Sequence, residues 1–213
     1  MKKKIFAFVL SFALIFGMSI FFAGCNSSTT AVVTIDFNND VDSNQQITVE
    51  KGQTIELPDG TTITPPHQYL EFDYWCTNTG LIFEEFEETC VITKSITIYA
   101  KWKIHENYNY AQVVSQSMSA SGINAGDYII YKYLSDEDVI ELNDIVMIEH
   151  NSQLQLRHIY QIIDNGDGSY SYKTKASSNA TEDYWTSTRH DVVGLYQETI
   201  ENPEQYLKYI GAL

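Results

Sequence analysis

The apolar and polar positions downstream of residue 31 alternate in short runs, which is the pattern of β-strands. In the stretch 95–102, Ile96, Ile98 and Ala100 alternate with Thr97 and other more polar neighbours, as expected for a strand with one buried face. Runs of this kind predict strands at 32–37, 45–57, 69–75, 95–102, 112–117, 127–134, 144–150, 154–163, 168–175 and 191–197. The predicted fold class is therefore mainly β.

The strands fall into two groups, which we interpret as two modules. The first covers residues 32–103 and the second covers 112–213, with a linker at 104–111 between them. In the second module, Pro-free strands at short spacing are typical of a twisted, barrel-like β-domain.

Two local signals refine the second module. The letters NGDGSY at 165–170 carry the Asn/Asp-Gly signature of a hairpin turn between two strands. The last dozen residues, 202–213, predict one short helix in which Pro203 occupies the first turn, where its missing N–H costs nothing.

The first 25 residues have the composition of an export signal. Three lysines follow the initiating Met, and an uncharged apolar run extends from Ile5 to Gly24; such a run can also span a bilayer. The letters FAGC, ending at Cys25, resemble the lipobox of bacterial lipoproteins. That resemblance implies removal of residues 1–24, a lipid on Cys25 and a polar tether at 25–31, so the chain is expected outside the cytoplasm, lipid-anchored to the bacterial cell membrane.

The charge of the chain argues against nucleic acid as a partner. The formal net charge is −15 over 213 residues, and it falls to −18 once Lys2, Lys3 and Lys4 leave with the signal. Phosphate backbones and anionic lipid surfaces attract basic patches and repel acidic chains. The expected contact with the membrane is therefore made through the N-terminal lipid.

Two cysteines remain after Cys25. Cys76 and Cys90 lie 14 residues apart in an exported module, where the oxidising compartment permits a disulfide. Two free thiols are the alternative. Because the sequence contains neither a CxxC nor an HExxH motif, we expect no metal site and no cofactor.

Four segments of the first module share the features of one family. The letters VTIDFNND, ITVEKGQTIELP, FDYWCTNTG and SITIYAKW resemble the Listeria–Bacteroides repeat, or internalin B-type repeat, over residues 32–103. The resemblance implies a β-grasp-like fold and a cell-surface partner. A single copy favours a spacer or docking module over an adhesive stalk, and an adhesin is the weaker alternative. In so small a domain, we expect its aromatic side chains mainly in the core.

The second module carries an ordered set of short motifs. These are Ser115-x-Ser117-Met118, GDYIIYK, NDIVMIE, LRHIYQI, YKTKASSNATEDYW and DVVGLY. Together they resemble the type I signal peptidase family, in its serine-histidine, endoplasmic-reticulum-type branch, over residues 112–197. The resemblance implies the signal-peptidase β-fold, with Ser117 as nucleophile, His158 as general base and Asp183 as the carboxylate that orients the imidazole.

Each proposed role follows ordinary acyl-transfer chemistry. A serine hydroxyl needs a base within hydrogen-bond reach, and a neutral imidazole can take its proton. The backbone N–H of Ser117 and the hydroxyl of Ser115 would stabilise the oxyanion. Lys132 and Lys175 are rival bases, whereas His67, His105, His150 and His190 lack a comparable context.

The expected function is a membrane-anchored serine endopeptidase that cleaves exported or surface polypeptides bound as an added β-strand. Residues 26–111 would hold its site away from the bilayer. The alternative is a non-catalytic surface lipoprotein, a scaffold or binding module, that retains a degenerate signal-peptidase fold. That alternative is motivated by Ala176-Ser177, which stand where the family has Gly-Asp.

Overall fold

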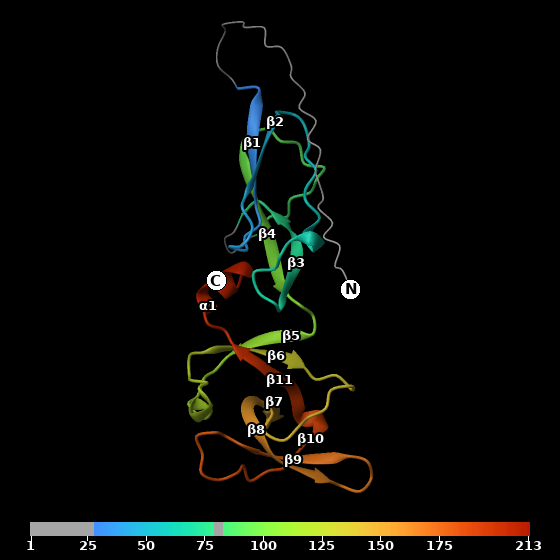
Figure 1. The fold of residues 1–213 in the computed structure, drawn as a ribbon, viewed down its shortest axis with the longest axis vertical. Helices are drawn as coiled ribbons and strands as arrows, with labels where there is room; N and C mark the ends of the chain where they lie inside the picture. Colours follow the sequence, from blue (N-terminus) through green and yellow to red (C-terminus); the bar gives the residue numbers. More distant parts are fainter. Residues whose placement is uncertain (1–27, 79–82) are drawn as a thin grey trace, which may run out of the picture.

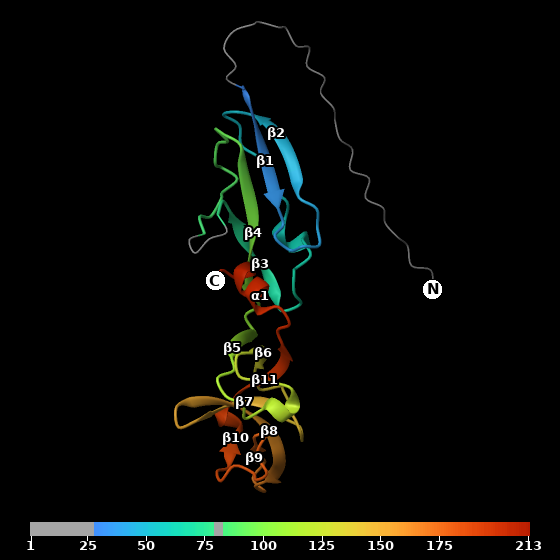
Figure 2. The same cartoon turned by 90° about the vertical axis from the view of Figure 1, so that its left-hand side faces the viewer.

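The computed structural model describes residues 28–78 and 83–213, and these residues form a mainly β structure with 41% strand and 9% helix. The strands make two sheets, which lie one beyond the other along the long axis of the molecule (Figures 1 and 2). The expected signal and the expected lipidation site, Cys25, lie outside the described residues. Within the described part of the chain, no helix is long and apolar enough to cross a membrane.

The first sheet has four strands in the order β2-β1-β4-β3. Its strands are β1 (Thr30–Asp36), β2 (Gln45–Glu50), β3 (Leu70–Cys76) and β4 (Ile96–Ile104). The central pair β1 and β4 is parallel, and the other two pairs are antiparallel. A short 3₁₀ turn, η1 (Gly60–Thr62), precedes β3.

Aromatic side chains fill much of the core of the first sheet, as predicted. Trp102 is fully buried and Trp75 nearly so, and the Trp102 indole N–H donates to the carbonyls of Phe37 and Asn38 at 3.2 and 2.9 Å. Tyr74 and Tyr99 are half-buried instead. Burying a tryptophan whose N–H has found partners avoids the cost of an unpaired donor.

The disulfide considered from the sequence is not formed, because Cys76 and Cys90 are both free thiols. Cys76 ends β3 in the core, where its thiol lies 3.3 and 3.5 Å from the carbonyls of Asn78 and Tyr99. Burial raises the pKa of this thiol. Cys90 is exposed, so the two side chains occupy different environments.

The second sheet has seven strands in the order β10-β9-β8-β7-β11-β6-β5, with every neighbouring pair antiparallel. The strands are β5 (Tyr108–Gln112), β6 (Tyr128–Tyr133), β7 (Ile145–His150), β8 (Gln153–Asp164), β9 (Tyr170–Lys175), β10 (Ser187–Thr188) and β11 (Val192–Thr199). A 3₁₀ turn, η3 (Arg189–Asp191), leads into β11.

The expected barrel is not closed. Strand β11 inserts between β7 and β6, which leaves β10 and β5 at opposite edges of the sheet. Closure would require these two end strands to pair, and β10 is only two residues long. The second sheet is therefore open, with β5 as one free edge among the described residues.

The predicted hairpin between β8 and β9 is confirmed. The two strands are antiparallel neighbours, and Gly166 and Gly168 in the connecting turn have φ of 79° and 87°. Such positive values favour glycine.

The predicted strand at 112–117 was wrong over most of its length. Strand β5 runs from 108 to 112, and the chain then leaves the sheet, with Val114 89% exposed. Only 105–107 separate β4 from β5. The segment that carries Ser117 is therefore an irregular continuation of edge strand β5.

The predicted C-terminal helix is confirmed as α1 (Pro203–Tyr209), with Asn202 as its N-cap and proline in its first turn. It packs against β4 of the first sheet. Tyr206 and Tyr209 belong to the core cluster that holds most of the buried residues of the first sheet and also Ile130 of β6, and the Lys101 ammonium on β4 donates to the carbonyl of Tyr209 at 3.5 Å. The chain thus returns to the first sheet after completing the second (Figure 1).

Candidate functional site

The segment 113–122 forms a compact turn above the second sheet. Met118 is fully buried and anchors it, in a cluster that includes Ile129 and Met147. The 3₁₀ turn η2 (Ser119–Ser121) follows and ends at Gly122, whose φ of 81° is left-handed. The Ser117 carbonyl accepts the N–H of Ser178 at 3.0 Å. This turn, hereafter the serine turn, presents several hydroxyls on a fixed backbone.

A groove of about 360 Å³ lies between the start of the serine turn and strands β7 and β8. Ala111 and Gln112, the last residues of edge strand β5, lie at one end. Most of the wall is apolar, and the polar groups include the serine hydroxyls and one guanidinium. The residues that matter below are Val113, Ser115, Ser117, Met147, Leu154 and Arg157.

The two serines predicted to act together do meet. The Ser115 and Ser117 hydroxyl oxygens are 3.0 Å apart, at the wall of the groove. The nearest charged group is the Arg157 guanidinium, whose Nη1 lies 3.5 Å from the Ser117 hydroxyl oxygen.

Each nitrogen of the Arg157 guanidinium has a hydrogen-bond partner. Its Nε donates to the two carboxylate oxygens of Asp183 at 3.1 and 3.4 Å, its Nη2 donates to the Gln155 side chain at 2.6 Å, and its Nη1 donates to the Leu156 carbonyl at 2.8 Å. Thr174 donates a further hydrogen bond to Asp183 at 2.7 Å. The side chains of Arg157 and Asp183 are only 13% and 7% exposed, so each depends on the other for charge compensation.

The expected Ser-His-Asp arrangement is not present in the structure. Asp183 binds Arg157 and Thr174, while the His158 ring binds the Ser121 hydroxyl at 2.7 Å and the Asn143 carbonyl at 3.2 Å. Neighbouring residues of a strand point to opposite sides, so a displacement by one residue exchanges the side chains that face a site. Arg157 precedes His158 on β8, and it is Arg157 that reaches Ser117.

The rival lysines also have other surroundings. The Lys132 ammonium lies 2.5 Å from the Asp138 carboxylate, a hydrogen bond that raises the pKa of Lys132. The Lys175 ammonium lies 5.9 Å from the centre of the Tyr160 ring. In the described part of the chain, neither lysine has a hydrogen bond to Ser117.

This arrangement changes the chemistry available at Ser117. A guanidinium has five donors and no acceptor, and it keeps its charge at any pH that a protein tolerates. It cannot take a proton from a serine, so Arg157 is not a general base. The group can hold a carbonyl oxygen or a hydroxyl by donation, which is binding chemistry.

No family model matches the chain, and no curated protein matches it. The resemblances to the signal peptidases and to the surface repeat therefore remain predictions. The pairing of Arg157, which lines the groove, with Asp183 was missed by sequence reasoning. The only available signal was the Arg-His dipeptide at 157–158, in which either residue could face Ser117.

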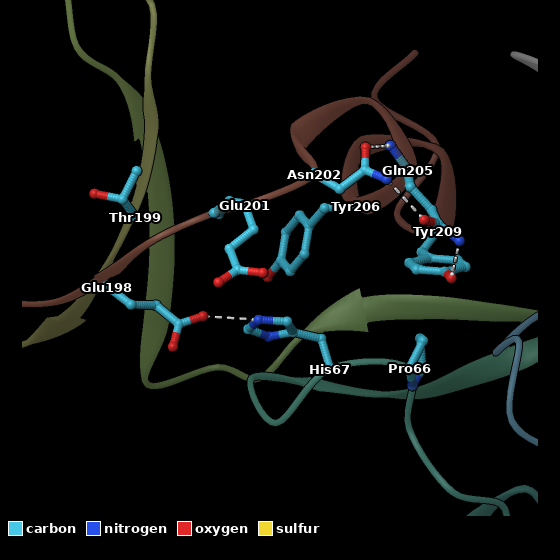
Figure 3. A pocket seen from close by; sticks show the side chains of 10 residues that line it. Pro66, His67, Glu198, Thr199, Glu201, Asn202, Gln205, Tyr206 and Tyr209 are labelled. Atoms are coloured by element: carbon cyan, nitrogen blue, oxygen red, sulfur yellow. Dashed lines mark hydrogen bonds and ion pairs between the residues drawn. The ribbon is translucent and has the colours of Figure 1, made fainter. Parts of the chain in front are cut away.

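A second cavity, of about 400 Å³, lies where the two sheets approach each other (Figure 3). His67, from the first sheet's side, points its Nε2 at the Glu198 carboxylate on β11, 2.7 Å away. Tyr206 of α1 packs edge-on against His67, and burial and the charge of Glu198 raise the pKa of Tyr206. The lining of this cavity contains no serine or cysteine nucleophile. We therefore interpret the cavity as a gap in the packing between the two sheets and α1.

Proposed function

We propose that this chain is an extracytoplasmic, lipid-anchored polypeptide-binding protein whose groove holds an extended segment without cutting it. The observation that supports this proposal is the position of Arg157, bound to Asp183 and next to Ser117. A base is required for serine acylation, and arginine is not one. The site keeps the donors of a peptidase groove and lacks its proton acceptor.

The edge of the second sheet suits an extended ligand. Strand β5 is an edge strand, and its last residues line the groove. A polypeptide that adds to such an edge gains main-chain hydrogen bonds, and alternate side chains enter the wall. Val113, Met147 and Leu154 would receive apolar side chains, while Ser115 and Ser117 would bond to the backbone of the ligand.

Charge argues against acidic segments as the ligand. Asp183 compensates the charge of Arg157, which lines the groove, and the chain as a whole is strongly acidic, with a formal net charge of −15. Acidic polypeptides would be repelled at long range. Exported polypeptides emerging from a membrane offer apolar extended segments of the required kind.

Other parts of the proposal extend the resemblances. Lipidation of Cys25 would place the chain on the outer face of the cell membrane. The first sheet would be a surface-repeat module of β-grasp type that sets the groove away from the bilayer or contacts a cell-surface partner. The second sheet would be a signal-peptidase-like domain with a degenerate site.

A serine endopeptidase is the second candidate. The observation that favours it is the 3.0 Å separation of the Ser115 and Ser117 hydroxyls at the groove, which is suited to a nucleophile with an oxyanion donor beside it. It requires a rearrangement that brings a base to Ser117, such as His158 leaving Ser121.

The two candidates are separated by a binding and cleavage experiment on the full chain in detergent. Fluorescent apolar peptides should bind, as measured by anisotropy, and mass spectrometry should find them intact. Arginine in place of Leu154, which is 54% exposed in the groove, should weaken binding roughly fivefold or more, since loss of an interface anchor costs over about 1 kcal/mol.

Leu142→Arg is the matched control, because Leu142 is 55% exposed and lies away from the groove lining. Equal binding by the two variants contradicts the groove proposal. Peptide cleavage that disappears in Ser117→Ala would instead establish the endopeptidase.

A further inference from the structure

A second serine of the serine turn has the partner that Ser117 lacks. The Ser121 hydroxyl oxygen lies 2.7 Å from His158 Nε2, and His158 Nδ1 lies 3.2 Å from the Asn143 carbonyl oxygen. Ser121 is exposed and His158 is half-buried. Nucleophile, imidazole and a third group that orients the imidazole are thus in contact, which is the geometry of an activated serine.

The hydrogen bonds fix the tautomer of the imidazole. A carbonyl oxygen only accepts, so the nitrogen that faces Asn143 must carry the ring proton. The neutral ring then presents the Nε2 lone pair to Ser121, whose hydroxyl donates to it. In this tautomer the imidazole is ready to take the serine proton.

The orienting carbonyl is itself fixed by the backbone. Asn143 has a φ of 73°, a left-handed conformation in which asparagine is tolerated. Its N–H donates to the Ile159 carbonyl at 2.9 Å, and the Ile159 N–H donates to the Asp144 carbonyl at 2.8 Å. The loop is therefore bound on both sides to β8, the strand that carries His158.

The serine is positioned from the other side. The Ser121 N–H donates to the Met118 carbonyl at 3.0 Å and to the Ser177 hydroxyl at 3.2 Å. Because Ser177 accepts that bond, its own hydroxyl proton remains able to stabilise a nearby oxyanion. Ser177 is also a residue that departs from the signal-peptidase pattern.

We propose that Ser121 and His158 form a nucleophile and base pair that accepts acyl groups from small, unhindered esters. Ser121 Oγ bonds to the ester carbonyl carbon while its proton passes to His158 Nε2. The tetrahedral intermediate then expels the alkoxide, which takes the proton from Nε2 and leaves as an alcohol. Water attacks acyl-Ser121 with the same base and releases a carboxylic acid.

The groove does not contribute to the choice of acyl group at this pair. The pair lies outside the groove lining, so no apolar wall selects a long chain or a peptide side chain. This activity does not depend on peptide binding in the groove, and Ser117 plays no part in it.

The experiment incubates the full chain with p-nitrophenyl acetate and maps acetylated serines by mass spectrometry. Ser121 should be the serine acetylated fastest. His158→Gln should slow acetylation roughly 100-fold, the size of effect that a positioned base supplies. Free imidazole added to His158→Ala should restore part of the rate, which a merely structural histidine would not allow.

Ser119→Ala is the matched control for Ser121→Ala. Ser119 belongs to the same 3₁₀ turn, and its hydroxyl bonds to Ser178 rather than to a base. Acetylation should persist in Ser119→Ala and vanish in Ser121→Ala, a comparison that stands even if the His158 variants unfold. Modification first at Ser117, equal modification of Ser119 and Ser121, or none above that of other exposed serines overturns the proposal.

Discussion

The two ends of the serine turn differ in the group that β8 supplies to each. Ser117 faces a guanidinium that cannot lose its proton, buried against a carboxylate. Ser121, four residues later, faces the imidazole of His158, whose other nitrogen meets a backbone carbonyl. Arg157 and His158 are consecutive residues of β8. Arg157 suits Ser117 to binding, whereas His158 suits Ser121 to proton transfer.

The largest expected effect comes from removing the carboxylate at the Ser117 end. Asp183→Ala leaves the buried Arg157 charge without its partner, which should lower the free energy of unfolding by about 3 kcal/mol or more. Urea denaturation measures the change. Glu182→Ala, which removes an exposed ion pair with Lys173, should change it by less than about 1 kcal/mol; equal losses would mean that the buried pair is not special.

The next effect tests whether the base alone distinguishes the two serines. Arg157→His places an imidazole where the guanidinium now meets Ser117 and Asp183. Modification of Ser117 by a fluorophosphonate should then rise roughly tenfold to 100-fold, a gain within the range of general-base catalysis. Peptide mapping by mass spectrometry gives the rate at each serine. An unchanged Ser117 rate in a folded variant would show that more than a base is missing.

A smaller effect is expected at the other end of the turn. Gly122 follows Ser121 at a φ of 81°, with open space around the position of a Cβ, so Gly122→Ala should cost about 1 kcal/mol through backbone strain alone. Thermal unfolding measures the loss. The shift of the backbone should reduce acetylation of Ser121 and leave peptide binding in the groove unchanged.

The smallest effect concerns a region remote from the turn. Burial, followed by the hydrogen bond to Asp40, raises the pKa of Tyr209 to about 12 from its usual value near 10. The protonated phenol is thus favoured by folding, so its stabilisation is complete below about pH 10 and is lost as the pH rises toward 12. Tyr209→Phe should show a weaker decline in unfolding free energy over that interval.

If α1 and the serine turn are independent, the titration of Tyr209 does not change the reactivity of Ser117 or Ser121. A loss of Ser121 acetylation in Tyr209→Phe at neutral pH would contradict that independence.

Much of the fold follows from local patterns. Alternation predicts most strands, and the glycines after Asn165 and Asp167 predict the turn between β8 and β9. The open edge of the second sheet is not local, because it depends on β11 inserting between two earlier strands. Likewise, the sequence predicts α1 with Pro203 in its first turn, but the surface it covers is set by distant residues such as Lys101 and Ile130.

The site shows the same division. Ser115 and Ser117 do meet, but in an irregular turn and not on the strand that the sequence predicts. The group that faces each serine depends on the register of β8, which the Arg157-His158 dipeptide alone does not reveal. That register includes an irregularity between Ile159 and Gln161, close to the residues in question. A bulge of this kind redirects side chains and has no recognisable signature in the sequence.

The central claim is that the imidazole of His158 belongs to Ser121 and not to Ser117. Proton-proton nuclear Overhauser effects from the His158 ring test it most directly. The account predicts strong effects to the β-protons of Ser121, none to those of Ser117, and a ring proton on Nδ1. Effects to Ser117, with the ring proton on Nδ1 directed at Asp183, would contradict it.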